Sequence, residues 1–100
     1  MAEAEKIVII WIEGHVQGVG FRAFIEREAD RLSIRGWARN RQNGDVEALF
    51  AGSIQGVDAL IETCRRGPHH ARVVNLMVRL PEADELLEVP HGGFLLLPTI

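Results

Sequence analysis

An uninterrupted run of six apolar residues, most of them β-branched, extends from Ile7 to Ile12 and ends at Glu13-Gly14. The run is far shorter than the roughly 20 apolar residues that cross a bilayer. A short apolar run with such an end is typical of a strand that is buried on both faces of a sheet. We therefore expect a central strand at residues 7–12.

Two later segments have the periodicity of helices. Between Phe21 and Leu32 the apolar positions recur three, four and seven or eight residues apart, and charged residues occupy the opposite face. A second helix is predicted over residues 54–66, because Ser53 suits the N-cap position and Gly67-Pro68 ends the pattern. Its apolar stripe consists of Ile54, Val57, Leu60, Ile61 and Cys64.

Extended segments separate these helices and follow them. Residues 34–42 and 45–51 flank Asn43-Gly44, a dipeptide that suits the positive-φ positions of a tight hairpin turn. The segment 71–80 alternates in the manner of a strand. On one side of that alternation lie Val74, Leu76, Val78 and Leu80.

The remaining residues complete the predicted order of elements. Residues 81–93 indicate a connecting loop with room for a short helical turn, and "FLLLP" at 94–98 a final short strand. The order βαββαβ predicts an antiparallel-dominated sheet with both helices on one face, because each βαβ half crosses right-handed. We expect an α+β protein with the ferredoxin-like α/β sandwich, as a single domain over residues 1–100. This architecture hosts unrelated functions, so the function must be argued from a site.

Composition and charge restrict the function further. With 47% hydrophobic and 25% charged residues, the chain is an ordinary soluble domain. The net charge of −3 argues against a nucleic-acid partner. The acidic start "MAEAEK" argues against a secretory signal, and the shortness of the apolar run at 7–12 argues against a membrane segment. The single cysteine, Cys64, cannot form an internal disulfide, which fits a reducing compartment. We expect a cytoplasmic monomer.

Other polar side chains indicate no further site. The histidines at 15, 69, 70 and 91 lack the spacing of a helical metal-ligand pair, and adjacent histidines point to opposite faces if extended, so we expect no metal. Arg35, Arg39 and Arg41 alternate along one predicted strand with Trp37 on their face. We expect them to form a solvated sheet face whose aliphatic stems partly cover the tryptophan.

The segment "GHVQGVGFR", from Gly14 to Arg22, joins the first strand to the first helix. Its glycines give access to positive φ and to close approach of a ligand, and successive inward amides before a helix favour an anion. Arg22 is disfavoured there by about 0.3–1 kcal/mol unless a negative group lies beside it. The guanidinium fork matches phosphate oxygens, so an anion site is one interpretation. The other is an ordinary pair with Glu26, one turn along the helix.

Two common phosphate-binding patterns are absent from the sequence. No Gly-Lys-Ser/Thr follows the glycines, as a Walker A loop requires, and no second strand carries the acid of a dinucleotide fingerprint. Asn40, taken alone, indicates only a solvated strand residue or a turn former.

Two segments carry a family resemblance. "IEGHVQGVGFR" at 12–22 and "GWARNRQNGDVEALFAG" at 36–52 resemble, in order and spacing, the signature segments of the acylphosphatase family. The resemblance covers roughly the first two thirds of the chain. It implies the ferredoxin-like sandwich and the hydrolysis of a small-molecule acyl phosphate to a carboxylate and inorganic phosphate, without a cofactor.

The same resemblance implies roles for individual residues. Arg22 resembles the phosphate-binding arginine, and Asn40 resembles the asparagine that orients the attacking water. The loop that would cradle the phosphate through its amides comprises His15, Val16, Gln17, Gly18, Val19, Gly20 and Phe21, with His15 peripheral. An alternative is a noncatalytic anion- or effector-binding module on the same fold, which would keep Arg22 and the loop without needing Asn40. An RNA-binding module is disfavoured by the net charge and by the lack of clustered aromatic residues on the predicted central strands.

Overall fold

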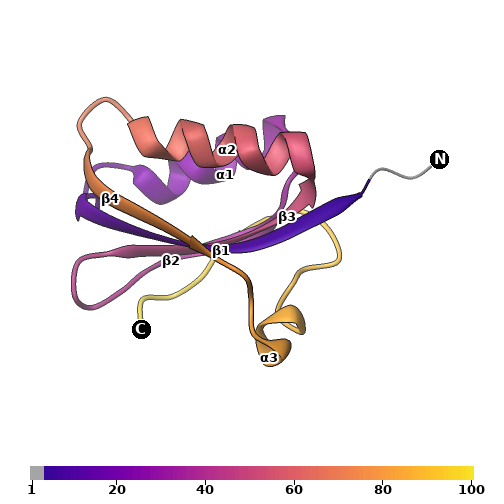
Figure 1. Ribbon diagram of the computed structural model, residues 1–100. Coiled ribbons are helices and arrows are strands. Elements are labelled where there is room, and N and C mark those ends of the chain that lie inside the picture. The colour runs from indigo at the N-terminus through magenta and orange to yellow at the C-terminus, as the bar shows by residue number, and fades with distance from the viewer. Residues whose placement is uncertain (1–3) are drawn as a thin grey trace.

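Five strands form one sheet in the order β4-β1-β3-β2-β5 in the computed structural model, which describes residues 4–100 (Figure 1). The strands are β1 (Glu5–His15), β2 (Arg35–Asn40), β3 (Val46–Ser53), β4 (Arg72–Arg79) and β5 (Phe94–Leu96). All neighbours pair antiparallel except β5, which pairs parallel to β2. The predicted ferredoxin-like sandwich is confirmed, with β5 added at the edge beside β2.

Both long helices, α1 (Phe21–Arg31) and α2 (Ile54–Arg66), lie side by side on one face of the sheet, and the short α3 (Ala83–Leu86) lies on the other (Figure 1). The Ser53 hydroxyl accepts a hydrogen bond from the Gly56 amide at 3.0 Å, so the predicted N-cap is confirmed. Within residues 4–100, no helix combines the length and apolarity that a bilayer crossing requires.

The main core fills the space between the helices and the sheet. Four members of the predicted stripe of α2 are buried in it, namely Val57, Leu60, Ile61 and Cys64. Ile54 does not join them: it is 45% exposed, because it is the first residue of the helix and lies at the end of the sheet layer.

The opposite face of the sheet carries a second, smaller apolar cluster. Its buried members are Ile9, Trp37, Leu49 and Ala51. Val89 and Leu97 pack over this cluster, and the Leu97 amide donates to the Ala38 carbonyl at 2.9 Å. The residues after α3 therefore cover this face, and the predicted burial of residues 7–12 on both sides is explained.

Of the face expected along β2, the cover of Trp37 by an arginine side chain is confirmed, whereas its solvated character is not. Trp37 is only 1% exposed, and the Arg39 guanidinium lies 4.6 Å from its ring centroid. Arg39 and Arg41 both bond to the buried carboxylate of Glu47, at 2.9 and 3.4 Å. Both guanidinium groups turn toward the sheet because the buried carboxylate on β3 attracts them, and the two side chains stay only partly exposed.

The alternation along β4 predicts burial poorly. Leu76 is its only buried residue, whereas Val74 and Val78 are 73% and 42% exposed. The register shifts between Glu13 and Gly14 of β1, so Val74 is an extra residue in a β-bulge. The strand also lies at the edge of the sheet, where it has a neighbour on one side only.

The β2–β3 hairpin forms where Asn43-Gly44 predicts it, with a longer turn. Within this turn, Gly44 alone takes a positive φ, of 99°. The Gly44 amide donates to the Arg41 carbonyl at 3.1 Å, and the Arg41 amide donates to the Asp45 carbonyl at 2.8 Å. These bonds enclose a three-residue loop, in which one left-handed residue suffices.

Candidate functional site

The loop between β1 and α1 is anchored at both ends by buried side chains. Val16 is 1% exposed and Phe21 is 2% exposed, and both belong to the main core. Between them, Gly18 and Gly20 have φ of 75° and 78°. A Cβ atom on either glycine would meet nothing within 4 Å, so the backbone conformation alone requires glycine there.

A pocket of about 200 Å³ opens beside this loop. It is lined by Val16, Gly18, Gly20, Phe21, Arg22, Ala23, Asn40 and Leu96. The structure therefore brings together Arg22 and Asn40, two predicted site residues that lie 18 positions apart in the sequence. Leu96, on β5, was not foreseen as a wall of the pocket.

Arg22 lies half-buried in the first turn of α1 without a carboxylate partner among residues 4–100. Its guanidinium donates from Nη1 to the Leu97 carbonyl at 3.4 Å, which is its one hydrogen bond within the described part of the chain. The other half-buried arginines, Arg35, Arg39 and Arg41, each bond to a glutamate.

The alternative pairing of Arg22 with Glu26 is not formed in the part of the chain that is described. The first turn of α1 also contains no acidic residue. The cation thus lies at the positive end of the helix, beside an open pocket, and no carboxylate of residues 4–100 pairs with it.

Asn40, the last residue of β2, lines the same pocket from the sheet side. Its carbonyl accepts a hydrogen bond from the Ile100 amide at 3.3 Å, which holds the strand end in place. Within the described residues its side-chain amide has no hydrogen-bond partner. This amide can therefore donate to or accept from a ligand or a water in the pocket.

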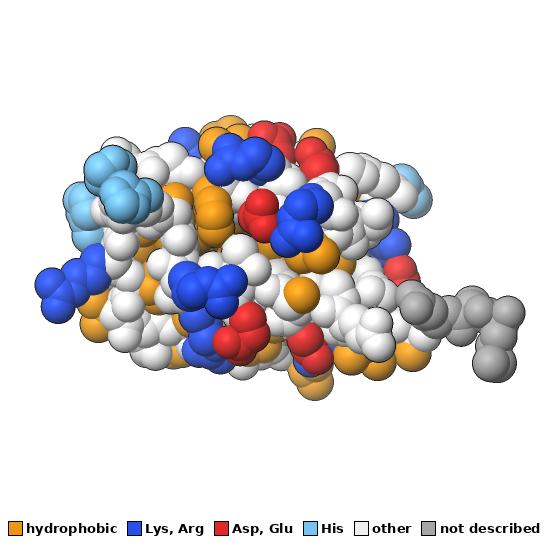
Figure 2. Space-filling view, turned by 90° about the horizontal axis from the view of Figure 1, so that it is seen from above, with side chains coloured by type: hydrophobic (Ala, Val, Ile, Leu, Met, Phe, Trp, Pro, Cys, Tyr) orange, Lys and Arg blue, Asp and Glu red, His pale blue; other side chains and the backbone are white. Residues whose placement is uncertain are grey.

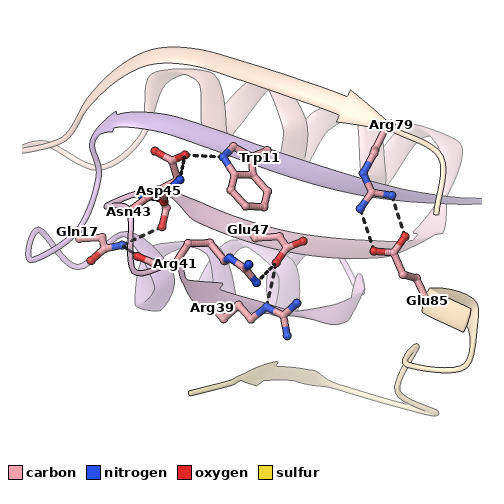
Figure 3. Close-up of polar contacts among 9 residues, drawn as sticks. All are labelled: Trp11, Gln17, Arg39, Arg41, Asn43, Asp45, Glu47, Arg79 and Glu85. Atoms are coloured by element: carbon pink, nitrogen blue, oxygen red, sulfur yellow. Dashed lines mark hydrogen bonds and ion pairs between the residues drawn. The ribbon is translucent and has the colours of Figure 1, made fainter. Parts of the chain in front are cut away.

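The remaining predicted loop residues do not line the pocket. His15 is exposed at the end of β1, and Val19 packs against the main core. Gln17 points to the hairpin, where its Nε2 donates to the carbonyls of Arg41 and Asp45 at 2.7 and 2.8 Å (Figure 3). Sequence spacing alone carries no signal for this contact, because the hairpin is a separate segment.

Histidine side chains lie at both ends of the helical face, and acidic and basic side chains are interspersed between them (Figure 2). His69 and His70 lie in a turn with their rings 4.8 Å apart, so they do not point to opposite sides as an extended pair would. Across residues 4–100, no three His, Cys, Asp or Glu side chains are grouped to hold a metal ion.

Cys64 lies in the core of α2 and is fully buried, as predicted. Burial raises the pKa of its thiol to about 12. The thiolate is the reactive form of cysteine, so this side chain is unsuited to act as a nucleophile.

Fold and pocket together define a ferredoxin-like sandwich in which the loop between β1 and α1 borders a pocket that Arg22 and Asn40 both line. The family model for acylphosphatase matches residues 8–87. An acylphosphatase of Rhodopseudomonas palustris (strain BisB18) is 48% identical over 92 residues, which cover 91% of this chain and 93% of the relative. The chain belongs to the acylphosphatase family.

Solved structures agree with this membership. The crystal structure of acylphosphatase from Bacillus subtilis matches with a TM-score of 0.78 at 32% identity, covering 91% of this chain and 97% of that one. An acylphosphatase structure from Coxiella burnetii matches with a TM-score of 0.82 at 28% identity and covers 93% of each chain.

Proposed function

We propose that the pocket between the loop, α1 and β2 is the active site, and that it hydrolyses small acyl phosphates to a carboxylate and inorganic phosphate. As a member of the acylphosphatase family, the chain is a hydrolase that acts on acyl phosphates. One observation carries the assignment of the site: Arg22 is half-buried and lacks a carboxylate partner in the described chain, at a helix N-terminus that shares a pocket with Asn40.

Arg22 and the loop amides would hold the phosphoryl group. The loop comprises His15, Val16, Gln17, Gly18, Val19, Gly20 and Phe21, and it leads into the positive end of α1. Phosphoryl transfer requires mainly positioning and neutralisation of charge on the equatorial oxygens. An arginine and fixed amides supply both, because they carry donors and positive charge that need no reorganisation during the reaction.

Asn40 would orient the water that attacks phosphorus. A neutral amide has no pKa suited to a general base, but its carbonyl oxygen accepts a hydrogen bond and its NH₂ group donates two. A glutamine orients the attacking water in some nucleotide hydrolases by the same means. Asn40 is held for this role by β2, whose end is bonded to Ile100.

The leaving group accounts for the absence of a general acid from the proposed mechanism. In the reaction, the water oxygen forms a bond to phosphorus while the bond from phosphorus to the acyl oxygen breaks. The carboxylate that leaves is a weak base and needs no proton. We assign the water proton to an oxygen of the phosphate.

Phosphate release from a generic acyl phosphate tests the proposal. Relative to wild type, Arg22→Ala and Asn40→Ala should each lose on the order of 10²–10⁴ in rate, because each removes a charge-stabilising or water-positioning group. Arg27→Ala and Asn75→Ala are matched controls: Arg27 lies on the same helix, Asn75 lies on β4, and both are exposed. Inorganic phosphate should inhibit competitively.

Two results would contradict the proposal. Full activity of Asn40→Ala would exclude the water-positioning role. A wild type that binds phosphate without hydrolysing acyl phosphates would favour a noncatalytic anion-binding module, in which Asn40 has no task.

We further propose that residues 1–100 act as one domain and as a cytoplasmic monomer. The edge strand β4 begins and ends with an arginine, and charged side chains on an edge strand disfavour pairing with a second chain. Light scattering at micromolar concentration should give a mass near 11.1 kDa. A concentration-independent dimer would contradict the proposal.

A further inference from the structure

We propose that Gln17 is a positioning residue. It would fix the loop between β1 and α1 against the end of β2 and thereby set the distance between the bound phosphate and Asn40. The inference rests on the proposed function. It concerns the side chain of Gln17, whereas the loop was assigned to phosphate through its backbone.

Gln17 is a bridge between two segments. Its Nε2 donates to the Arg41 carbonyl at 2.7 Å and to the Asp45 carbonyl at 2.8 Å (Figure 3). A side-chain amide nitrogen has two N–H donors, so both are used. Only the NH₂ end of the amide can face two carbonyl oxygens, which fixes the orientation of the group.

The far end of this bridge is rigid. The Arg41 amide donates to the Asp45 carbonyl at 2.8 Å and closes the hairpin. The Asp45 carboxylate accepts from Trp11 Nε1 at 2.6 Å and from Asn43 Nδ2 at 3.0 Å (Figure 3). Trp11 belongs to β1, the strand that leads into the loop. Gln17 therefore connects the loop to a hairpin that is itself hydrogen-bonded to the central sheet.

The bridge lies one residue from the pocket on each side. Gly18, next to Gln17, and Asn40, next to Arg41, both line the pocket. A movement of the loop relative to the hairpin therefore changes the geometry between the phosphate and the attacking water. A misplacement of about 1 Å can cost on the order of 10²-fold in rate.

Variants at position 17 separate hydrogen bonding from packing. Gln17→Met keeps the length of the side chain and removes both donors, whereas Gln17→Lys keeps N–H donors on a side chain that is one atom longer. We expect Gln17→Met to lower kcat by about 10- to 100-fold. The inhibition constant of inorganic phosphate should stay near the wild-type value, because Arg22 and the loop amides move together. Gln17→Lys should recover most of the lost kcat.

Gln42→Met is the matched control, since Gln42 is exposed in the same hairpin and its side chain forms no hydrogen bond within the described residues. It should leave kcat unchanged. Combining Gln17→Met with Asn40→Ala should add little to the loss from Asn40→Ala alone, because the two residues act through one geometry.

Several outcomes would overturn the inference. They are wild-type kcat in Gln17→Met, losses that multiply in the double variant, or a loss of phosphate affinity as large as the loss of kcat. Failure of Gln17→Lys to recover activity would also count against it. If Asn40→Ala is impaired while Gln17→Met is not, only this inference fails. An inactive wild type would overturn both this inference and the proposed function.

Discussion

Replacing Arg22 with glutamine should separate stability from phosphate binding. In the unliganded protein two effects of this change oppose each other. The variant loses a long hydrogen bond to the Leu97 carbonyl, 3.4 Å, and an ordinary hydrogen bond contributes about 0.5–1.5 kcal/mol. It is also relieved of a cation at the positive end of α1, which costs about 0.3–1 kcal/mol. The free energy of unfolding should therefore change by less than about 1 kcal/mol.

Phosphate should distinguish the two proteins. At a phosphate concentration ten times its Kd, the wild type gains about 1.4 kcal/mol of stability. For a domain of this size that gain raises Tm by about 6–11 °C. The same phosphate concentration should produce a much smaller shift in Arg22→Gln, because the guanidinium that pairs with the anion is gone.

Thermal unfolding followed by circular dichroism, with and without phosphate, measures both quantities. Arg27→Gln is the control: it makes the same charge change on the same helix at an exposed position without an ion pair in the described chain. Stabilisation by phosphate as a general salt is common to all variants and cancels in the comparison. A phosphate shift in Arg22→Gln equal to that of the wild type, or a loss of more than about 2 kcal/mol without phosphate, would refute the reasoning.

Three further predictions concern stability and titration. Ser53→Ala should lower the free energy of unfolding by about 1 kcal/mol, because the Gly56 amide loses its cap; denaturant unfolding measures this, and an unchanged midpoint would contradict it. The Cys64 thiol, with a pKa raised to about 12 by burial, should resist a disulfide reagent at pH 8 until denaturant is added, and rapid labelling of the native protein would disprove its burial. Two hydrogen bonds from Arg79 lower the pKa of Glu85 from its ordinary 4.5 to about 2, so the stabilisation from this pair is present above pH 4.5 and lost as the pH falls toward 2. The difference in unfolding free energy between wild type and Glu85→Gln should shrink over that range, and a difference independent of pH would contradict the assignment.

Much of the fold follows from the sequence because its causes are local. The change from helical to alternating periodicity sets the type of each element, and Ser53 and Gly67 set the ends of α2. Local chemistry also singled out Arg22, since the opposition between a cation and a helix N-terminus is visible in a few residues. The role proposed for Asn40 rests instead on the family resemblance, because nothing in the neighbouring sequence distinguishes Asn40 from an ordinary strand residue.

Other features depend on contacts between distant segments. The strand at β4 was predicted correctly, but the exposure of Val74 and Val78 was not foreseen, because alternation does not tell an edge strand from a central one. The pairing of Arg39 and Arg41 with Glu47 requires that β2 and β3 lie in register. The β-bulge at Val74 exists only because β4 pairs with β1. Each of these is a property of the assembled sheet.

The sequence by itself determined the elements and their order, and it drew attention to Arg22 as a cation at a helix N-terminus. Tertiary structure decided where residues 94–100 lie. As a result, Leu97 packs over the cluster that contains Trp37, and Leu96 lines the pocket. The contact between Arg22 and Leu97 joins residues 75 positions apart, and those of Gln17 with the hairpin span 24 and 28 positions. Such contacts form only when the whole sheet has assembled, because no local periodicity or charge pattern specifies which distant segment will lie alongside.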